Sequence, residues 1–172
     1  SEVEKGVNVS ENLWRLGIEK HPATLDRILN LLESERWDVR REAAKAVGEF
    51  KDKKTLSALF KAFNEEKEPH AASGIVSGIC GVDMPPGISF MAKGAAKWPE
   101  SEFGTEVKKI HPSWLEKIDL NPFIELGTKS KINEVSELFK RAKAHYSREP
   151  KPKSNPTSLA FSITPEHASL KT

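Results

Sequence analysis

The chain has 172 residues, of which 37% are hydrophobic and 8% aromatic, so it can build one domain with one moderate core and no large ligand pocket. Its formal net charge of +2 is unevenly divided, since residues 1–86 carry 13 basic and 15 acidic side chains and residues 87–172 carry 14 and 10. So small an asymmetry is typical of a solvated surface. The single cysteine, Cys80, excludes an internal disulfide and a cysteine-based zinc site of ordinary ligand count.

The apolar runs are too short for a membrane helix, which needs roughly 18 residues. The longest run lies over 74–82 and contains glycine and serine. We therefore expect a soluble chain without a membrane span, in an intracellular reducing compartment that is either the cytoplasm or an organelle interior. Because the chain begins with Ser1 rather than methionine, it is either missing a leader or numbered from inside a longer product.

A unit of about thirty-one residues repeats within 13–81, which is the period of stacked helical hairpins. Residues 17–25 align with 48–56 without a gap, with glycine, lysine, threonine and leucine in equivalent positions. Apolar residues continue in this register with the i, i+3, i+4, i+7 spacing of an amphipathic helix. They are Leu25, Ile28, Leu29 and Leu32 in the first unit and Leu56, Leu59, Phe60 and Phe63 in the second.

The repeat region is expected to follow a short N-terminal arm over 1–10 and to occupy 11–81. Helices are predicted over 11–16, 22–34, 38–50, 55–66 and 69–80, the first of them capped by Ser10 and ended by Gly17. Asp38 should cap the helix that it begins and pair with Arg41. In that helix the predicted inward positions are Val39, Ala43, Ala46, Val47 and Phe50, while Arg40, Arg41 and Lys45 stay in solvent.

The helix over 69–80 is unusual because one side carries almost only glycine, alanine and serine. Glycine inside a helix costs about 1 kcal/mol relative to alanine. Another element should therefore lie close against Gly74, Gly78 and Gly81, and its packing must offset that cost.

Beyond the repeats the periodicity fails. Residues 82–110 are expected to form an irregular loop insertion with a short helix over 89–97. A C-terminal helical cap follows over 111–146, with helix restarting at His111, an interruption at Asn121-Pro122 and a last helix over 133–146. Its apolar positions, Val135, Leu138, Phe139 and Ala142, repeat the earlier spacing and indicate a degenerate third unit. Residues 147–172 read as an extended tail rich in proline and serine.

The repeat unit and the segment Asp38-Val39-Arg40-Arg41-Glu42-Ala43-Ala44 resemble the short HEAT-like repeat of phycobilin lyases and related scaffolds. The resemblance covers about half the chain and implies an all-α fold, a short α-solenoid of HEAT-like helical hairpins with an irregular mid-chain loop and an extended C-terminal tail. It also implies that Val39 is a core residue and that Arg40 bridges neighbouring repeats. At Pro69-His70-Ala71 the Asp-Val-Arg pattern is missing, so no such bridge is expected from the second unit.

The sequence contains no constellation that predicts catalysis. Its five histidines have neither the spacing nor the neighbours of a metal site, and Cys80 reads as a buried structural thiol, so no cofactor or metal is expected. The glycines near 74–81 and 87–94 lack the Lys-Ser/Thr of a phosphate loop, and close helix packing accounts for them. Glu65, Glu66 and Glu68 read as a solvated surface turn.

These observations favour a non-enzymatic scaffold that binds another protein, as an adaptor, an assembly factor or a peripheral subunit of a larger complex. The second helices of hairpins line the concave side in the resembled architecture, so the expected partner-binding residues are Arg36, Trp37, Arg40, Arg41 and Lys45. One alternative, from the resemblance alone, is a lyase-like or chaperone-like factor for a protein that carries a phycobilin. Another is a nucleic-acid binder that uses the basic stretch from Lys129 to Lys153.

The tail supplies a second expected contact. Leu159, Phe161 and Ile163 alternate, so in an extended backbone they project to one side. A segment with four prolines and little apolar content cannot offset about 1–2 kcal/mol of backbone entropy per residue by itself. We therefore expect either the solenoid or a partner to hold this segment, and we favour a partner that binds these three side chains.

Overall fold

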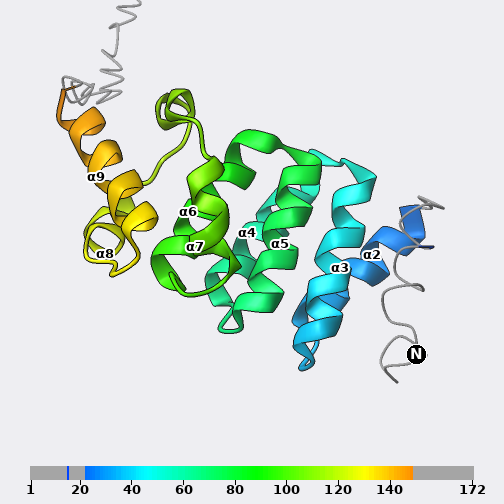
Figure 1. Ribbon diagram of the computed structural model, residues 1–172. Coiled ribbons are helices and arrows are strands. Elements are labelled where there is room, and N and C mark those ends of the chain that lie inside the picture. The colour runs from blue at the N-terminus through cyan, green and yellow to red at the C-terminus, as the bar shows by residue number, and fades with distance from the viewer. Residues whose placement is uncertain (1–14, 16–21, 149–172) are drawn as a thin grey trace, which may run out of the picture.

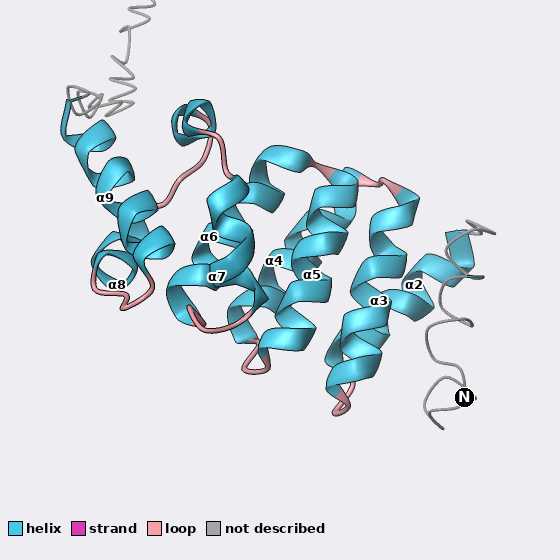
Figure 2. Ribbon diagram, in the orientation of Figure 1, coloured by secondary structure: helices cyan, strands magenta, loops and turns pink. Residues whose placement is uncertain are grey.

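The computed structural model describes Arg15 and residues 22–148, and this part of the chain contains helices, turns and short loops but no strand (Figures 1 and 2). The α-helices are α2 (Pro22–Asn30), α3 (Trp37–Phe50), α4 (Leu56–Glu65), α5 (Pro69–Val82), α6 (Met84–Lys97), α7 (Glu102–Glu106), α8 (Ile124–Thr128) and α9 (Asn133–Arg148). Short 3-10 turns follow α2, precede α4 and fill most of the stretch between α7 and α8.

The helices form a row, from α2 and α3 at one end to α8 and α9 at the other (Figure 1). α2 packs on α3 and α4 packs on α5, which gives two hairpins in the predicted register, and α5 lies between α3 and α6. The predicted all-α solenoid is therefore confirmed. None of the helices described is both long and apolar enough to cross a membrane.

One hydrophobic core runs through the row from Ile28 in α2 to Ala142 in α9. The apolar stripes of the two repeat units supply its first half, where Leu32, Val47, Leu59 and Phe63 are buried as the sequence predicts. Leu29 and Phe60, which were expected in the same core, are only partly buried and pack against its edge.

The small-sided helix α5 lies unusually close to α3, as its composition predicts. A side chain at Gly78 would clash with the carbonyl oxygen of Ala44, and a Cβ at Gly48 would lie 2.8 Å from the Cα of Gly78. The two backbones touch at these points, so the glycines are required by the packing. Gly48, the glycine that recurs in the repeat, lies inside α3 and does not end it. The residue that caps the C-terminus of α3 is Lys51, whose backbone is in the left-handed region with φ 53°.

The prediction of an irregular loop over 82–110 is wrong for most of that segment, because α6 is a full helix that packs on α5 and begins five residues earlier than the short helix expected over 89–97. Pro85 and Pro86 looked like a turn, but they occupy the first turn of the helix, where a missing N–H costs no hydrogen bond. Gly87 lets α6 approach the backbone of Cys80.

The irregular part of the chain instead follows α6. Residues 98–123 contain the five-residue α7 and three 3-10 turns, and the helix expected to restart at His111 is one of these turns, Pro112–Glu116. Tyr146 in α9 anchors residues 118–120 of this segment to the last helix. Its hydroxyl donates to the carbonyl of Ile118 at 2.5 Å and accepts from the N–H of Leu120 at 3.2 Å.

The C-terminal end closes the row with α8 packed against α9. The prediction of a last helix over 133–146 is confirmed, with two further residues, and Val135, Leu138, Phe139 and Ala142 are its buried positions. Its other side is polar and exposed, as expected of a cap. Several predictions fall outside the described residues. They are the arm over 1–10, the helix over 11–16 apart from Arg15, its end at Gly17, and the tail beyond Arg148.

Candidate functional site

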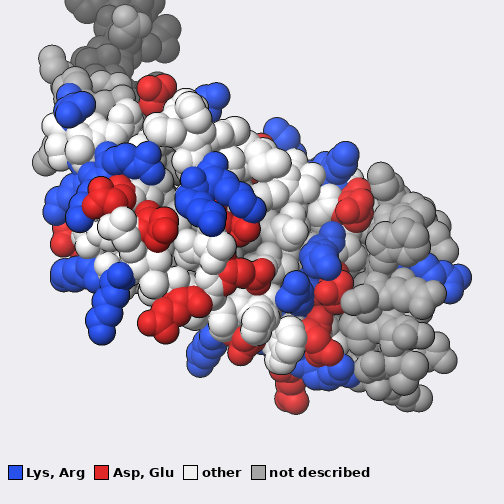
Figure 3. All heavy atoms as spheres, in the orientation of Figure 1, with Lys and Arg blue, Asp and Glu red and all other residues white. Residues whose placement is uncertain are grey.

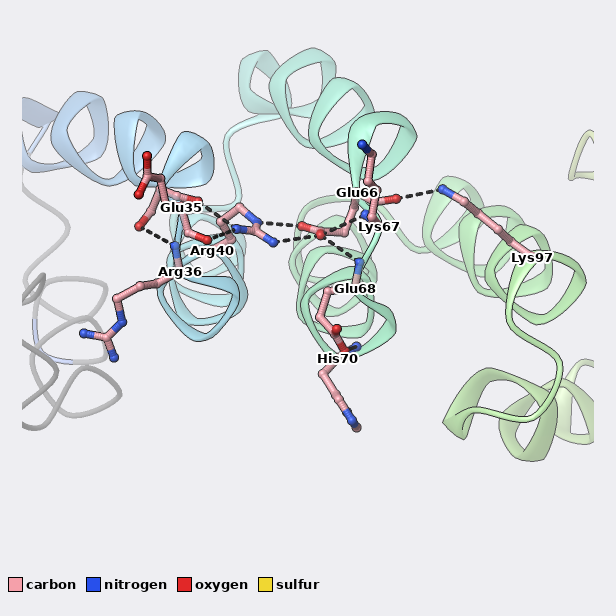
Figure 4. A network of polar contacts seen from close by, with 9 residues as sticks. Glu35, Arg36, Arg40, Glu66, Lys67, Glu68, His70 and Lys97 are labelled. Carbon is pink, nitrogen blue, oxygen red and sulfur yellow. Dashed lines mark hydrogen bonds and ion pairs between the residues drawn. The ribbon is translucent and has the colours of Figure 1, made fainter.

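An ion pair between the partly buried Arg40 and the buried Glu66 joins the first hairpin to the second (Figure 4). Arg40 in α3 donates from Nε and Nη2 to the two carboxylate oxygens of Glu66 at 2.8 and 2.9 Å. Its Nη1 donates to the backbone carbonyls of Ser34 and Glu35 at 2.7 and 2.9 Å. All three guanidinium nitrogens are thus occupied, in the planar fork geometry that suits arginine.

Glu66 accepts from both sides of the turn in which it sits. Besides Arg40, its Oε1 receives the backbone N–H groups of Lys67 at 2.9 Å and Glu68 at 3.0 Å. Its own carbonyl oxygen accepts from Nζ of Lys97 in α6 at 2.7 Å. Figure 4 shows that Arg40, Glu66 and Lys97 therefore form a polar ladder across α3, the α4–α5 turn and α6.

The electrostatics of the ion pair follow from its burial. Burial alone would raise the pKa of Glu66, but the hydrogen bonds from Arg40 and from the N–H groups of Glu68 and Lys67 outweigh it and hold the pKa below its ordinary value. The hydrogen bond to Glu66 raises the pKa of Arg40 in turn. Both groups are consequently charged at neutral pH, and neither is free for another ligand.

This geometry corrects two predictions. Arg40 was expected to stay in solvent on a binding face, but its side chain is 19% exposed and its charge is used internally. The role implied by the resemblance, a bridge between repeats, is the one it has. Glu66 was expected in a solvated turn, yet its side chain is 3% exposed. Glu66 is the repeat equivalent of Glu35, whose backbone carbonyl also receives Arg40, but the sequence carries no signal that the side chain of Glu66 is buried.

The remaining residues of the predicted binding face lie on α3 or just before it. Trp37 is the first residue of α3 and is 44% exposed. Arg36 precedes it and bonds through Nε to Asp38 at 3.1 Å, so the predicted pairing of Asp38 with Arg41 is wrong. Arg41 and Lys45 follow at helical spacing and both lie near Glu42, at 3.7 and 3.2 Å.

We define the α3 face as Trp37, Arg41 and Lys45, one turn apart along the helix. Lys45 is exposed, Arg41 is partly exposed, and Glu42 offsets one of their two charges. Arg41 also covers Gly74 of α5, because a Cβ there would clash with the backbone of Arg41. The α3 face therefore keeps an exposed aromatic ring and a small net positive charge.

An open hollow lies beside the start of α5. Its volume is about 490 Å³, and its lining comes from the first residues of α5 and from the connection between α6 and α7. We call it the Trp98 hollow, and its lining residues are Pro69, His70, Trp98, Pro99, Glu100, Ser101 and Glu102. The ring of His70 also lies 5.6 Å from that of Trp37, so the hollow and the α3 face meet at one aromatic contact.

The basic stretch that suggested nucleic-acid binding is largely carried by α9. In Figure 3 blue side chains gather over the α8–α9 end, with red ones among them. Two of these cations are paired, Lys140 with Glu137 at 2.9 Å and Lys143 with Glu125 at 3.0 Å. The pairing reduces the local positive charge, and residues 149–153 of the stretch lie outside the described residues.

The groups that were considered for chemistry have structural surroundings. Cys80 is partly buried against Gly87, and burial raises the pKa of its thiol, which disfavours the reactive thiolate. Within the described part of the chain, His, Cys, Asp and Glu do not gather in any group of three or more that could hold a metal ion. Leu159, Phe161 and Ile163, the predicted contacts of the tail, lie outside the described residues.

Comparison with known proteins gives one match. A family model of HEAT repeats matches residues 11–78, the segment that contains both hairpins and the Arg40–Glu66 pair. No curated protein and no solved structure is significantly similar to the chain. The match does not distinguish the phycobilin-lyase type of repeat from others, so that part of the resemblance stays a prediction.

Proposed function

Because this chain is a HEAT-like repeat protein, a class that commonly serves as a scaffold for protein interactions, we propose that it binds a protein partner through the α3 face. Its role would be that of an adaptor, an assembly factor or a peripheral subunit of a larger complex, without catalysis of its own. The supporting architecture is a row of helices with an extended outer surface. A reducing intracellular compartment remains the location we propose, on the ground of the single thiol.

One observation carries the proposal: Trp37 exposes 44% of its surface at the start of α3, beside the exposed His70 of α5. Tryptophan is large and mostly apolar, and it is among the residues that dominate binding energy when a partner buries them. Arg41 and Lys45 extend the same line along the helix, where they would set the orientation of a partner more than its affinity. Arg40 has no part in this surface.

The test compares two double charge reversals in purification of the full chain from its native cells after cross-linking. Arg41→Glu with Lys45→Glu should reduce the recovery of the partner by at least about tenfold, since each reversed charge now repels the complementary group. Lys129→Glu with Lys131→Glu changes the same charge on exposed lysines before α9 and should leave recovery unchanged. Trp37→Ala should lower recovery as well.

Each variant must first show the circular dichroism and melting temperature of the wild type, because exposed charges contribute little to folding. If folded Arg41→Glu/Lys45→Glu and Trp37→Ala proteins retain the same partners in the same amounts as the control, the α3 face is not the binding surface. If no protein is cross-linked to the wild type, the scaffold proposal itself fails.

A further inference from the structure

The Trp98 hollow has the size and lining of a binding site for a short peptide segment. Ligand sites are commonly concave regions of about 300–1,000 Å³ with mostly apolar walls and a few polar groups, and the hollow has about 490 Å³. Its walls combine the indole of Trp98 and the ring of His70 with two prolines. A second hollow of about 410 Å³ is lined by Arg40 and Glu66, whose charges already neutralise each other.

The carboxylates of the hollow indicate that a ligand bound there carries a positive charge. Glu100 and Glu102 are exposed, and neither has an ion-pair partner among the described residues. Glu68, the residue before Pro69, caps α5 by accepting the N–H of His70 and adds a third carboxylate next to the lining residues in the chain. In Figure 3 red side chains, with some blue ones among them, lie along the lower edge of the view. A cation is therefore favoured over an anion here.

The aromatic rings beside these carboxylates favour arginine as that cation. A guanidinium can stack on an indole face and bond a carboxylate through two N–H groups at the same time, which a compact ammonium cannot do. Nζ of Lys97 already lies 4.3 Å from the centroid of the Trp98 ring, so this ring holds a cation, and the three carboxylates outnumber that one positive charge. The two prolines and His70 leave apolar surface for a neighbouring side chain of the ligand.

We propose that the Trp98 hollow binds a segment of a partner protein in which an arginine adjoins an apolar residue. The proposal rests on the proposed scaffold function and adds the chemistry of the partner. The arginine pairs with Glu100 or Glu102 and stacks against the aromatic wall, while its apolar neighbour covers Pro69 and Pro99. Since His70 touches Trp37, a partner held in the hollow continues onto the α3 face.

The test uses random twelve-residue peptides displayed on phage and selected on the full chain, followed by fluorescence polarisation with the selected peptides. We expect arginine next to an apolar or aromatic residue in the selected set. Glu100→Gln with Glu102→Gln should weaken their binding about tenfold. The matched control, Glu116→Gln with Glu134→Gln, removes two exposed carboxylates elsewhere and should bind like the wild type.

The indole N–H signal of Trp98 in a two-dimensional ¹⁵N NMR spectrum locates the binding. It should shift on addition of a selected peptide and stay in place when the arginine of that peptide is replaced by glutamate. Selected peptides without arginine, equal binding to Glu100→Gln/Glu102→Gln, or an unmoved Trp98 signal would each overturn the proposal. If the chain binds its partner through the α3 face and not through the Trp98 hollow, the Arg41→Glu/Lys45→Glu protein still loses the partner, so failure of this proposal can be told apart from failure of the proposed function.

Discussion

At the scale of single residues, the Arg40–Glu66 pair is the contact on which the first two hairpins most depend. Arg40→Met keeps the apolar stem of the side chain and removes the charge, which leaves the buried Glu66 with only its two backbone donors. Loss of one partner from a buried pair typically costs about 3–5 kcal/mol. Because Arg40 retains 19% exposure, we expect the lower end of that range in urea unfolding.

Lys45→Met provides the control for this variant, since it breaks an exposed pair with Glu42 on the same helix. Exposed pairs contribute about 0–1 kcal/mol, so its midpoint should hardly move. Adding Glu66→Gln to Arg40→Met should recover part of the loss, because the uncompensated charge disappears. Equal effects of Arg40→Met and Lys45→Met would mean that the bridge contributes no more than a surface pair.

The same pair predicts how stability depends on pH. The pKa of Glu66 is lower in the folded than in the unfolded chain, so the unfolded chain binds more protons as the solution is acidified. The stabilisation is complete above the ordinary glutamate value of about 4.3 and is lost as the pH falls through the lower folded pKa. Unfolding free energies measured by urea titration should therefore fall less steeply below about pH 4.3 for Glu66→Gln than for the wild type. Glu65→Gln, next to it and exposed, should keep the wild-type slope.

At the scale of helices, the distance between α3 and α5 is set by glycine. Replacing an exposed helical glycine by alanine usually stabilises a protein by about 0.4–1 kcal/mol. At Gly78 the sign should reverse, because the new methyl group would clash with the carbonyl of Ala44 and two backbones would have to separate. We expect Gly78→Ala to lower the unfolding free energy by about 1–3 kcal/mol or more.

Ser77→Ala is the matched substitution on the exposed side of α5 and should be neutral or slightly stabilising. Thermal melts of the two variants give the comparison directly. A Gly78→Ala protein as stable as Ser77→Ala would mean that α3 and α5 can move apart at little cost.

The helices that the sequence predicts well are those with a complete apolar stripe. α3, α4, α5 and α9 have four or more apolar positions at helical spacing, and their buried sides agree with the prediction, although in α4 only Leu59 and Phe63 are fully buried. The first part of α6, before the helix expected over 89–97, was missed because Pro85, Pro86 and Gly87 read as turn signals, although they lie in its first turns and Gly87 makes a close contact. Local helix propensity does not predict which element of the tertiary structure packs against a glycine.

The candidate site also has parts that could be predicted from the sequence and parts that could not. That Arg40 bridges to a neighbouring repeat was implied by the family resemblance, whereas the helical pattern alone placed Arg40 in solvent. That Glu66 is the acceptor depends on burial, which a surface-like run of three glutamates conceals. The Trp98 hollow could not be predicted, since it joins the start of α5 to a connection about thirty residues later in the chain.

At the scale of the whole molecule, the core is continuous from α2 to α9, so the row should unfold as one unit. Hydrogen exchange followed by mass spectrometry across a urea series can test this by comparing peptides from α3 and α9. Both should lose protection at the same urea concentration, because α6 packs against both α5 and the C-terminal helices. Earlier loss in α9 would show that the C-terminal end is a separate cooperative unit.

The two interactions of the polar ladder, Arg40 with Glu66 and Lys97 with Glu66, restrict substitutions in this sequence differently. Arg40 recognises the side chain of Glu66, so a change at either position is tolerated only with a compensating change at the other. Lys97 recognises the backbone carbonyl of Glu66, which every amino acid supplies. The contact between α3 and the α4–α5 turn therefore depends on the identity of two residues at once. The contact between α6 and that turn is kept by any substitution at position 66 that leaves the backbone in place.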